Sequence, residues 1–406
     1  MMHVDMLIIG GGISGLGMAW HCQKAGLSTR VLEQHAQVGG LIASRQQPEQ
    51  TGDFWLELGA HSAFNSYQEL LAIVADCQLQ SLITPKKSPP FKFFKAGKLQ
   101  SLLKQIYWFS LLRALPRLFS LSKENLSVQD YYTQIMGEKT YDALMQHAFN
   151  AVLCQDARHF PADLLFRKRA RARDTAKKFT FAAGMQHIAR ALAETLEKRG
   201  VLFHVETPVI RLEYRDHQFE ITTADQRTFS SRFLTLATPV ETAAQLLSFS
   251  FPSLATLLSQ IKMATVHSVG VAVRKEEVRL PIVGGIIGAD SPFYSVVSRD
   301  YLWDARYRGL TFHFKADFND PLAQEQLIAD LLGIKPSQFL WRDRKINQLP
   351  ALTVDNLFDL AQITAQLQHL PLALIGNYFN GVSIEDCLVR TRGEFQRLQA
   401  QMGTLN

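Results

Sequence analysis

The chain has 406 residues, and at roughly 150 residues per domain this length predicts two or three domains. Its 24 glycines and 15 prolines are too few for a collagen-like or a disordered protein. The four cysteines lie far apart without a CxxC pair, so the sequence predicts neither a disulfide scaffold nor a metal site and favours a reducing compartment. The net charge of +6 suits an acidic small molecule or an anionic membrane surface and does not require nucleic acid.

The start of the chain carries no basic secretory signal, because its first apolar run ends in glycines. Uncharged stretches long enough to span a bilayer, such as Thr242 to Ile261, are interrupted by Ser, Gln and Pro252, so no transmembrane helix is predicted. We therefore expect a cytoplasmic protein that can touch the inner face of a membrane peripherally.

The first motif lies at the N-terminus. The apolar run Met6 to Ile9 predicts a buried parallel strand, Leu16 to Lys24 predicts a helix, and G-G-G-I-S-G stands between them. A second strand follows and ends at Glu33, where an acidic side chain would meet a ribose hydroxyl. This β-α-β arrangement is typical of dinucleotide binding, because glycines admit a pyrophosphate and a helix N-terminus attracts it. The predicted cofactor contacts are Gly10, Gly12, Ile13, Ser14, Gly15 and Glu33.

A second glycine pair, Gly39 and Gly40, follows the acidic residue, and Ser44 stands just beyond it. The pattern E-x5-GG-x3-[ST] resembles the flavoprotein group that contains amine oxidases, carotenoid desaturases and protoporphyrinogen oxidase. The resemblance implies FAD rather than NAD as the cofactor. In that group an Arg or Lys often follows the glycine pair, whereas this chain has Leu41, so one expected cationic contact is missing. The resemblance adds five predicted cofactor contacts: Gly39, Gly40, Gly59, Ala60 and His61.

The segment from Leu70 to Leu121 is predicted to be helical, and its part from Leu99 onward is amphipathic with interspersed basic residues. Such a helix can lie in a membrane interface or can be an ordinary core helix whose cations face water. Helices are also expected from Glu124 to Asp156. The basic run Arg167 to Lys178 is either a solvated surface or a funnel for an anionic substrate, for which Lys86, Lys87 and Lys92 offer further cations.

The middle of the chain resembles the same flavoproteins. A helix over Gln186 to Gly200 precedes two strands, and a buried strand then ends in L-A-T-P at Pro239. The resemblance implies that Val209 presents its backbone to the adenine. Residues 263–315 alternate as a half-buried sheet does and are predicted to be β-rich.

The C-terminal segment predicts a second strand-turn-helix unit, with a strand over Leu372 to Ile375 and a helix over Ile384 to Ala400. The turn between them resembles the C-terminal flavin signature of protoporphyrinogen oxidases. Cys387 does not match the flavin-linked cysteine of monoamine oxidases, so we expect FAD to be bound without a covalent link. The implied cofactor contacts are Gly376, Gly381, Val382 and Ser383.

Together these motifs predict an α/β protein with a discontinuous Rossmann-like FAD-binding domain. We expect it to comprise residues 1–82, 177–245 and 346–406, with an inserted substrate domain made of a helical cap (83–176) and a β-rich part (246–345). The expected function is an FAD-dependent oxidoreductase that resembles protoporphyrinogen oxidase and transfers hydride from a hydrophobic, carboxylate-bearing small molecule to the flavin. The alternatives are another flavin amine oxidase or desaturase, or a redox-inactive flavin-binding scaffold. No catalytic side chain is predicted, His61 being expected mainly as a cofactor contact, and the electron acceptor and the oligomeric state stay open.

Overall fold

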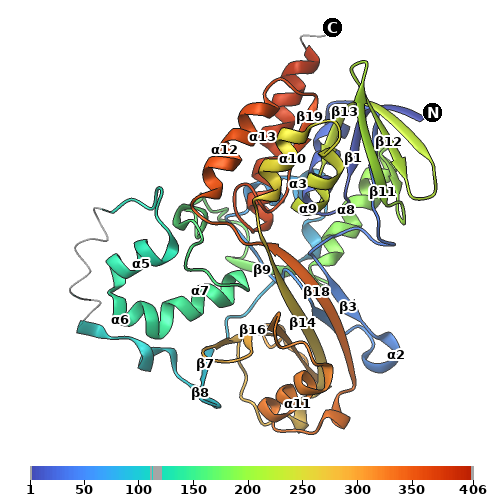
Figure 1. Cartoon of the computed structure of the whole chain (residues 1–406). Helices are drawn as coiled ribbons and strands as arrows, with labels where there is room; N and C mark the ends of the chain where they lie inside the picture. The colour runs from blue at the N-terminus through green and yellow to red at the C-terminus, as the bar shows by residue number, and fades with distance from the viewer. Residues whose placement is uncertain (1, 110–111, 113–120, 404–406) are drawn as a thin grey trace.

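The computed structural model describes residues 2–109, 112 and 121–403 (Figure 1). One end of the molecule holds a sheet enclosed by helices. A second sheet lies at the other end, and its two long strands, β14 (Met263–Arg274) and β18 (Trp341–Pro350), extend back toward the first. A group of short helices, α5 to α7, lies to one side of these strands.

The first sheet has seven strands in the order β10-β2-β1-β13-β12-β11, and β19 pairs with the second half of β13. The pairs β10-β2, β2-β1, β1-β13 and β13-β19 are parallel, whereas β11 and β12 form an antiparallel hairpin. This sheet therefore joins three parts of the chain that lie far apart in the sequence. Its strands are β1 (Met2–Ile9), β2 (Thr29–Leu32), β10 (Leu202–His204), β11 (Val209–Arg215), β12 (Gln218–Thr223), β13 (Thr228–Leu236) and β19 (Leu372–Leu374).

Helices cover both faces of this sheet, because alternate residues of its central strand point to opposite sides. Met6 and Ile8 are buried in one apolar cluster with residues of α1, α3, α8 and α13, and Leu7 and Ile9 are buried in another with residues of α9, α10 and α12. The arrangement confirms the predicted α/β fold. The helices are α1 (Ile13–Lys24), α3 (Gln68–Asp76), α8 (Gln186–Lys198), α9 (Val240–Leu247), α10 (Pro252–Ser259), α12 (Asn356–Leu367) and α13 (Ile384–Gly403).

The second sheet also has seven strands, in the order β18-β14-β17-β16-β15-β7-β8. The helix α11 (Pro321–Leu332) packs on it through a separate apolar cluster. The predicted β-rich character of residues 263–315 is confirmed. Its strands are β7 (Phe91–Lys95), β8 (Lys98–Gln100), β14 (Met263–Arg274), β15 (Gly285–Gly288), β16 (Phe293–Ser298), β17 (Tyr307–Lys315) and β18 (Trp341–Pro350).

Two small sheets connect the larger ones. One is a hairpin and the other has the order β5-β9-β6. The short helix α2 (Pro48–Thr51) links the two strands of the hairpin. The hairpin consists of β3 (Ser44–Gln46) and β4 (Trp55–Glu57), and the three-stranded sheet consists of β5 (Ala63–Phe64), β6 (Ile83–Pro85) and β9 (Lys178–Phe181).

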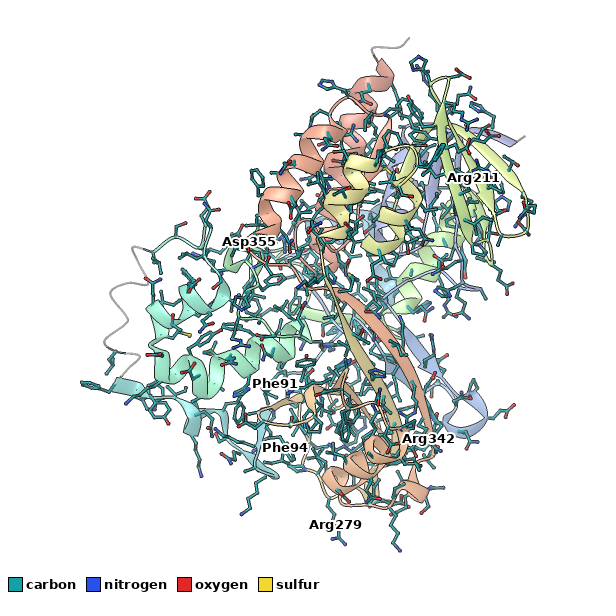
Figure 2. The ribbon with its side chains drawn as sticks, viewed as in Figure 1. Phe91, Phe94, Arg211, Arg279, Arg342 and Asp355 are labelled. Atoms are coloured by element: carbon teal, nitrogen blue, oxygen red, sulfur yellow. The ribbon has the colours of Figure 1, made fainter. Side chains whose placement is uncertain are left out.

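The prediction of helix from Leu70 to Leu121 is wrong for residues 83–100, which form β6, β7 and β8. The reason is tertiary, because β7 pairs with β15 of the second sheet, where Phe93 is fully buried and Phe91 is exposed. Figure 2 labels Phe91 and Phe94 on this strand. Of the expected amphipathic helix from Leu99, residues 110–111 and 113–120 lie outside the described residues. A short 3-10 turn, Leu102–Gln105, precedes them.

The predicted helices from Glu124 to Asp156 are confirmed as α5 (Val128–Met136), α6 (Glu138–Thr140), a π-helical turn (Tyr141–Met145) and α7 (Gln146–Leu153). Among the helices of the described ranges, none is both long and apolar enough to cross a membrane.

Candidate functional site

The N-terminal glycines have different roles in the structure. Gly10 has a φ of +105°, and a Cβ there would lie 2.5 Å from the carbonyl oxygen of Ala237; a Cβ on Gly15 would lie 1.9 Å from the oxygen of Gly10. Gly10 therefore lets the turn after β1 approach the end of β13, and Gly15 lets α1 approach that turn. A Cβ on Gly12 would meet only the Cα of Gly40, at 3.9 Å, so Gly12 faces open space.

The helix α1 begins at this open face. Its N-cap is Gly12, which offers no side chain to accept hydrogen bonds from the first turn. Ile13 and Ser14 are buried, and the carbonyl of Ser14 accepts a 3.4 Å hydrogen bond from the Thr391 hydroxyl of α13. The helix N-terminus thus combines free backbone donors with the positive end of the helix dipole, which suits a phosphate.

Glu33 lies at the end of β2 beside the glycine turn and is 6% exposed. Its carboxylate accepts hydrogen bonds from the backbone N–H groups of Gly11 (2.7 Å) and His35 (2.9 Å). Since each carboxylate oxygen has two acceptor sites, these bonds orient the group and leave acceptor sites for a ribose hydroxyl. The backbone N–H of Thr207 bonds to the Glu33 carbonyl at 2.8 Å, which brings the start of β11 and Val209 near the same end of the sheet.

The second glycine pair packs against the first. Gly39 donates from its N–H to the carbonyl of Gly11 at 2.9 Å, and a Cβ on Gly40 would lie 3.3 Å from the Cα of Gly12. The φ angles of +127° at Gly39 and +60° at Gly40 favour glycine at both positions. The carbonyl of Gly40 accepts a 2.7 Å hydrogen bond from Nζ of Lys345, a residue of β18 that the sequence prediction did not include.

The Gly59–His61 turn follows β4 and contacts the backbone just after the second glycine pair. A Cβ on Gly59 would lie 1.9 Å from the carbonyl oxygen of Leu41, so this close approach of two backbone segments requires glycine. The ammonium group of Lys86 donates to the carbonyl of His61 (2.6 Å) and to the hydroxyl of Ser62 (2.8 Å). The same ammonium lies 3.1 Å from the centre of the Tyr301 ring, so Lys86 clamps the turn from a buried position.

The ionisable groups around this turn are mostly basic. Burial lowers the pKa of Lys86 to about 6, and it also lowers the pKa of Lys178. Burial, with Lys86 and Lys178 nearby, holds the pKa of His61 well below its usual range, so this imidazole is neutral. The nearby carboxyl group of Glu57 accepts hydrogen bonds from the Ser44 hydroxyl and the Met185 N–H, and burial raises its pKa to about 7.

A polar row from the second sheet reaches the same turn. Asn347 donates through Nδ2 to the carbonyl of Leu58 and to the hydroxyl of Ser268, both at 2.8 Å. The Ser268 hydroxyl lies 2.8 Å from Nδ1 of His313, whose pKa burial lowers to about 4. The sequence contained no motif for this row, because its three members come from β14, β17 and β18 and meet only across the sheet.

The C-terminal turn packs onto the start of α13. Gly376 and Gly381 have φ angles of +152° and +120°, and a Cβ on Gly381 would lie 2.8 Å from Oδ2 of Asp386. The hydroxyl and the N–H of Ser383 both bond to Oδ2 of Asp386, which also pairs with Arg169. The Ser383 hydroxyl is therefore engaged as a cap of α13, and Val382 packs half-buried beside the apolar core.

The predicted residues around the glycine pairs, Glu33 and the start of β11 thus meet along one end of the first sheet. The uncapped helix, the two facing glycines and the held carboxylate fit the phosphates and a ribose of a dinucleotide. The basic run is dispersed: Arg169 pairs with α13, Lys178 is half-buried, and most other cations of Arg167 to Lys178 are exposed.

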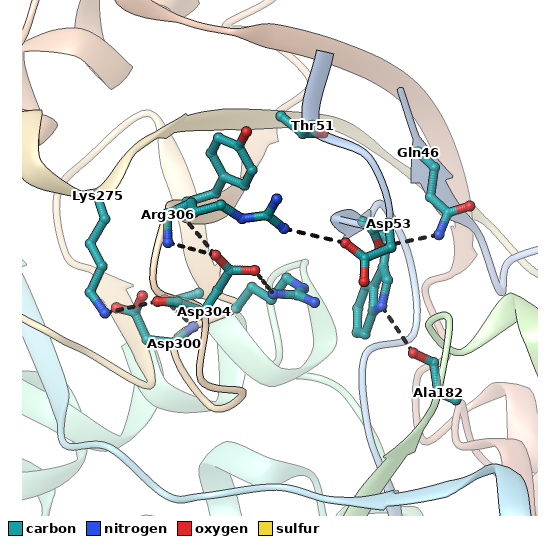
Figure 3. A network of polar contacts seen from close by, with 12 residues as sticks. Gln46, Thr51, Asp53, Ala182, Lys275, Asp300, Asp304 and Arg306 are labelled. Carbon is teal, nitrogen blue, oxygen red and sulfur yellow. Dashed lines mark hydrogen bonds and ion pairs between the residues drawn. The ribbon is translucent and has the colours of Figure 1, made fainter. Parts of the chain in front are cut away.

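A separate cavity of about 250 Å³ lies beside the loop 299–309; none of the predicted cofactor contacts lines it, but Lys87, one of the cations predicted for an anionic substrate, does. Figure 3 shows the polar network around it, in which Lys275 donates to the carbonyl of Asp304 and Arg306 pairs with Asp53. The guanidinium of Arg299 stacks over Phe54 and Trp55. These groups are largely paired with one another, so the cavity is part of a structural network.

Comparisons with known proteins agree with this geometry. The family model described as flavin containing amine oxidoreductase matches residues 13–309, well over half of the chain. A candidate protoporphyrinogen oxidase from Exiguobacterium sp. 255-15 has a TM-score of 0.75 at 16% identity, with 98% of this chain and 99% of that chain covered.

Two further solved structures share the fold. The CLA-producing fatty acid isomerase from P. acnes has a TM-score of 0.75 at 16% identity, covering 97% of this chain and 98% of that chain. Cyclohexylamine oxidase from Brevibacterium oxydans IH-35A has a TM-score of 0.72 at 16% identity, covering 98% and 99%. Fold, glycine turns and family model together lead to one assignment: this chain belongs to the flavin-containing amine oxidoreductase family and is an FAD-dependent oxidoreductase.

Proposed function

We propose that FAD binds along the end of the first sheet, with its pyrophosphate at Gly12 and the N-terminus of α1 and with a ribose at Glu33. The open face of Gly12, the uncapped helix and the buried carboxylate support this placement. The adenine lies near Val209, and the flavin end extends toward the 59–61 turn. The remaining proposed contacts are Gly10, Ile13, Ser14, Gly15, Gly39, Gly40, Gly59, Ala60, His61, Gly376, Gly381, Val382 and Ser383.

The FAD-binding domain in this proposal comprises residues 1–82, 177–245 and a third segment that begins after β18. This third segment begins after Pro350 and not at residue 346, because β18 pairs with β14 of the second sheet up to Pro350. The strands β7 and β8 (residues 91–100) belong to the second sheet and thus to the substrate domain, β6 pairs with β9 of the FAD-binding domain, and the cap begins after residue 100.

The proposed substrate is a hydrophobic molecule that carries a carboxylate. The observation that supports it is the position of two lysines beside the 59–61 turn: Lys86, which is buried, and Lys178, which is half-buried. In the part of the chain that the structure describes, neither cation forms an ion pair, and the nearby Glu57 is engaged elsewhere. Burial lowers the pKa of Lys86 to about 6, and a bound carboxylate would raise this pKa and stabilise the ammonium form of Lys86, whereas the ammonium form of an amine would lower it further.

Bound FAD supplies the redox chemistry by accepting a hydride from the substrate. The chain's own groups orient the two molecules and exclude water. His61 and His313 are held neutral by burial, so neither adds a positive charge to the site at neutral pH. Asn347, which is bonded to the Ser268 and His313 pair, holds the carbonyl of Leu58, and Lys86 holds the carbonyl of His61.

We also propose peripheral contact with a membrane through the segment before the cap helices. From residue 77 to 123 the sequence has nine Lys or Arg residues and no Asp or Glu. Leu103, Tyr107 and Trp108 are each more than half exposed there. Exposed aromatic side chains among cations suit an anionic lipid surface, from which a hydrophobic acid can be collected. Cosedimentation with anionic but not with neutral vesicles is the expected result.

The second candidate is an oxidase of amines or a related desaturase, favoured by the fold shared with cyclohexylamine oxidase. The fold is also shared with a fatty acid isomerase, so a further candidate substrate is a fatty acid, a hydrophobic carboxylate that would be isomerised without net oxidation. A redox-inactive flavin scaffold is a third alternative.

Anaerobic stopped-flow spectroscopy separates these functions. The holoenzyme is mixed with protoporphyrinogen, an unsaturated fatty acid, primary and secondary amines, or reduced nicotinamides, and flavin bleaching is followed. Rapid bleaching by a hydrophobic carboxylate but not by amines is the expected result. Bleaching by amines would assign the second candidate, and a flavin that dithionite cannot reduce would assign the scaffold.

A further inference from the structure

The inward face of β18 carries three polar side chains in alternate positions. Asp343 lies 3.4 Å from Nε of Arg45, Lys345 donates from Nζ to the carbonyl of Gly40 at 2.7 Å, and Asn347 donates to the carbonyl of Leu58 at 2.8 Å. Because strand residues two apart share a face, these side chains form one row along the segment 40–58. The second sheet therefore places a lysine directly at the glycine pair of the first.

The charge of Lys345 is not compensated by a carboxylate. Asp343 turns toward Arg45, and within the described ranges Lys345 makes no ion pair. Burial and the neighbouring Arg45 lower the pKa of Lys345 to about 8. An ammonium group has three donors, and Gly40 takes one of them. The Lys345 ammonium is half-buried, lies near the guanidinium of Arg45 and has two further N–H donors. A bound anion would therefore stabilise its charged form.

The place of this cation is defined by the glycines. Gly40 and Gly12 face each other with the Cα of one 3.3 Å from the Cβ that the other would carry. Gly12 also begins α1, so the Lys345 ammonium, the uncapped helix and the open glycine face converge. The residue after the glycine pair, Leu41, has no charge to offer there.

We propose that Lys345 binds the pyrophosphate of FAD and supplies from β18 the cationic contact that position 41 lacks. This inference rests on the proposed placement of FAD, and it assigns to a strand of the second sheet a part in holding the cofactor. A charge-assisted contact between an ammonium and a phosphate would also tie the two sheets together when the cofactor is bound.

The test compares apoproteins of the wild type, Lys345→Met and Lys345→Arg. The control is Arg342→Met, which removes a cation from the exposed, opposite face of the same strand (Figure 2). Binding of FAD is followed by quenching of flavin fluorescence, and binding of ADP and of riboflavin by calorimetry. Lys345→Met should weaken FAD and ADP by about tenfold to a hundredfold and leave riboflavin unchanged. Lys345→Arg and Arg342→Met should stay within about threefold of the wild type.

A wrong assignment of Lys345 and a wrong placement of FAD would give different results. If the wild type binds FAD and ADP while Lys345→Met binds them equally well, or if the variant loses riboflavin as strongly as ADP, the contact between Lys345 and the pyrophosphate is wrong. If the wild type binds neither FAD nor ADP, the proposed cofactor site falls and this inference with it. Leu41→Arg in the Lys345→Met background should restore at least part of the affinity for ADP; no restoration would overturn the equivalence of the two positions.

Discussion

The carboxylate of Glu33 is the residue-scale feature on which ribose binding depends. It is already oriented by the N–H groups of Gly11 and His35, so it needs no rearrangement to accept a ribose hydroxyl. Glu33→Gln should weaken FAD binding by about 1.5–3 kcal/mol, the range for a hydrogen bond to a charged group. Titration of the apoprotein with FAD measures this, with the exposed Glu206→Gln as a control. Wild-type affinity in the Glu33 variant would refute the ribose contact.

The glycines of the first turn separate folding from binding. Gly10→Ala should lower the stability of the apoprotein by at least ~1–3 kcal/mol, because its φ is +105° and the added Cβ would meet the Ala237 carbonyl. Gly12→Val has room for its Cβ and a φ of −73°, so we expect an apoprotein of near-normal melting temperature that no longer binds FAD. Thermal unfolding and FAD titration on both variants give the answer. Equal effects of the two changes would contradict these separate roles.

Glu57 should make the stability of the apoprotein depend on pH. Burial raises its pKa in the folded state to about 7, above the ordinary value of 4.5, so the folded state holds a proton that the unfolded state has lost. Its contribution is fully present below pH 4.5 and is lost as the pH rises through about 7. In the Glu57→Gln variant, the free energy of unfolding should therefore decrease less steeply than in the wild type as the pH rises from 4.5 to about 7. Urea unfolding at several pH values tests this, and a wild-type slope in the variant would assign the dependence to another group.

At the scale of elements, Glu385 couples α13 to α3. This buried side chain accepts hydrogen bonds from the N–H groups of Glu69 (3.0 Å) and Leu70 (3.3 Å) in the first turn of α3. Glu385→Ala would leave both donors buried without a partner and should cost about 1–3 kcal/mol of stability. Glu385→Gln keeps an acceptor and should cost less. Denaturant unfolding of both variants measures the difference, and an Ala variant as stable as the wild type would show that the coupling is unimportant.

At the scale of the whole molecule, the state of the four cysteine thiols explains why the flavin should be released by denaturation. Cys387 is buried within α13, and burial raises its pKa to about 12, so its thiol stays protonated. The other three cysteines are also free thiols, and two of them are buried. Acid precipitation of the yellow holoenzyme should therefore leave all of the FAD in the supernatant. Flavin absorbance in the washed precipitate would demonstrate a covalent link.

Local patterns in the sequence were sufficient for the parts of the fold whose interactions are local. The turn around Gly10 to Gly15, the acidic residue at the end of β2 and the strand-turn-helix near Gly381 each carry backbone requirements that only certain residues meet. The alternating pattern of residues 263–315 likewise indicated a sheet, because period-2 alternation is a property of the strand itself. These features predicted the α/β fold and the flavin cofactor.

Contacts between distant segments were decided only by the tertiary structure. Residues 91–95 are strand because β15 offers them a sheet edge, although their own sequence suggested helix. Lys345 meets Gly40 across 305 positions, and the Ser268, His313 and Asn347 row forms across three strands. No local pattern encodes such meetings, because they depend on how two sheets dock, and the free energy of docking comes from buried surface contributed by the whole chain. The sequence by itself therefore determined which cofactor the chain uses, and the docking of the two sheets decided which charges surround it.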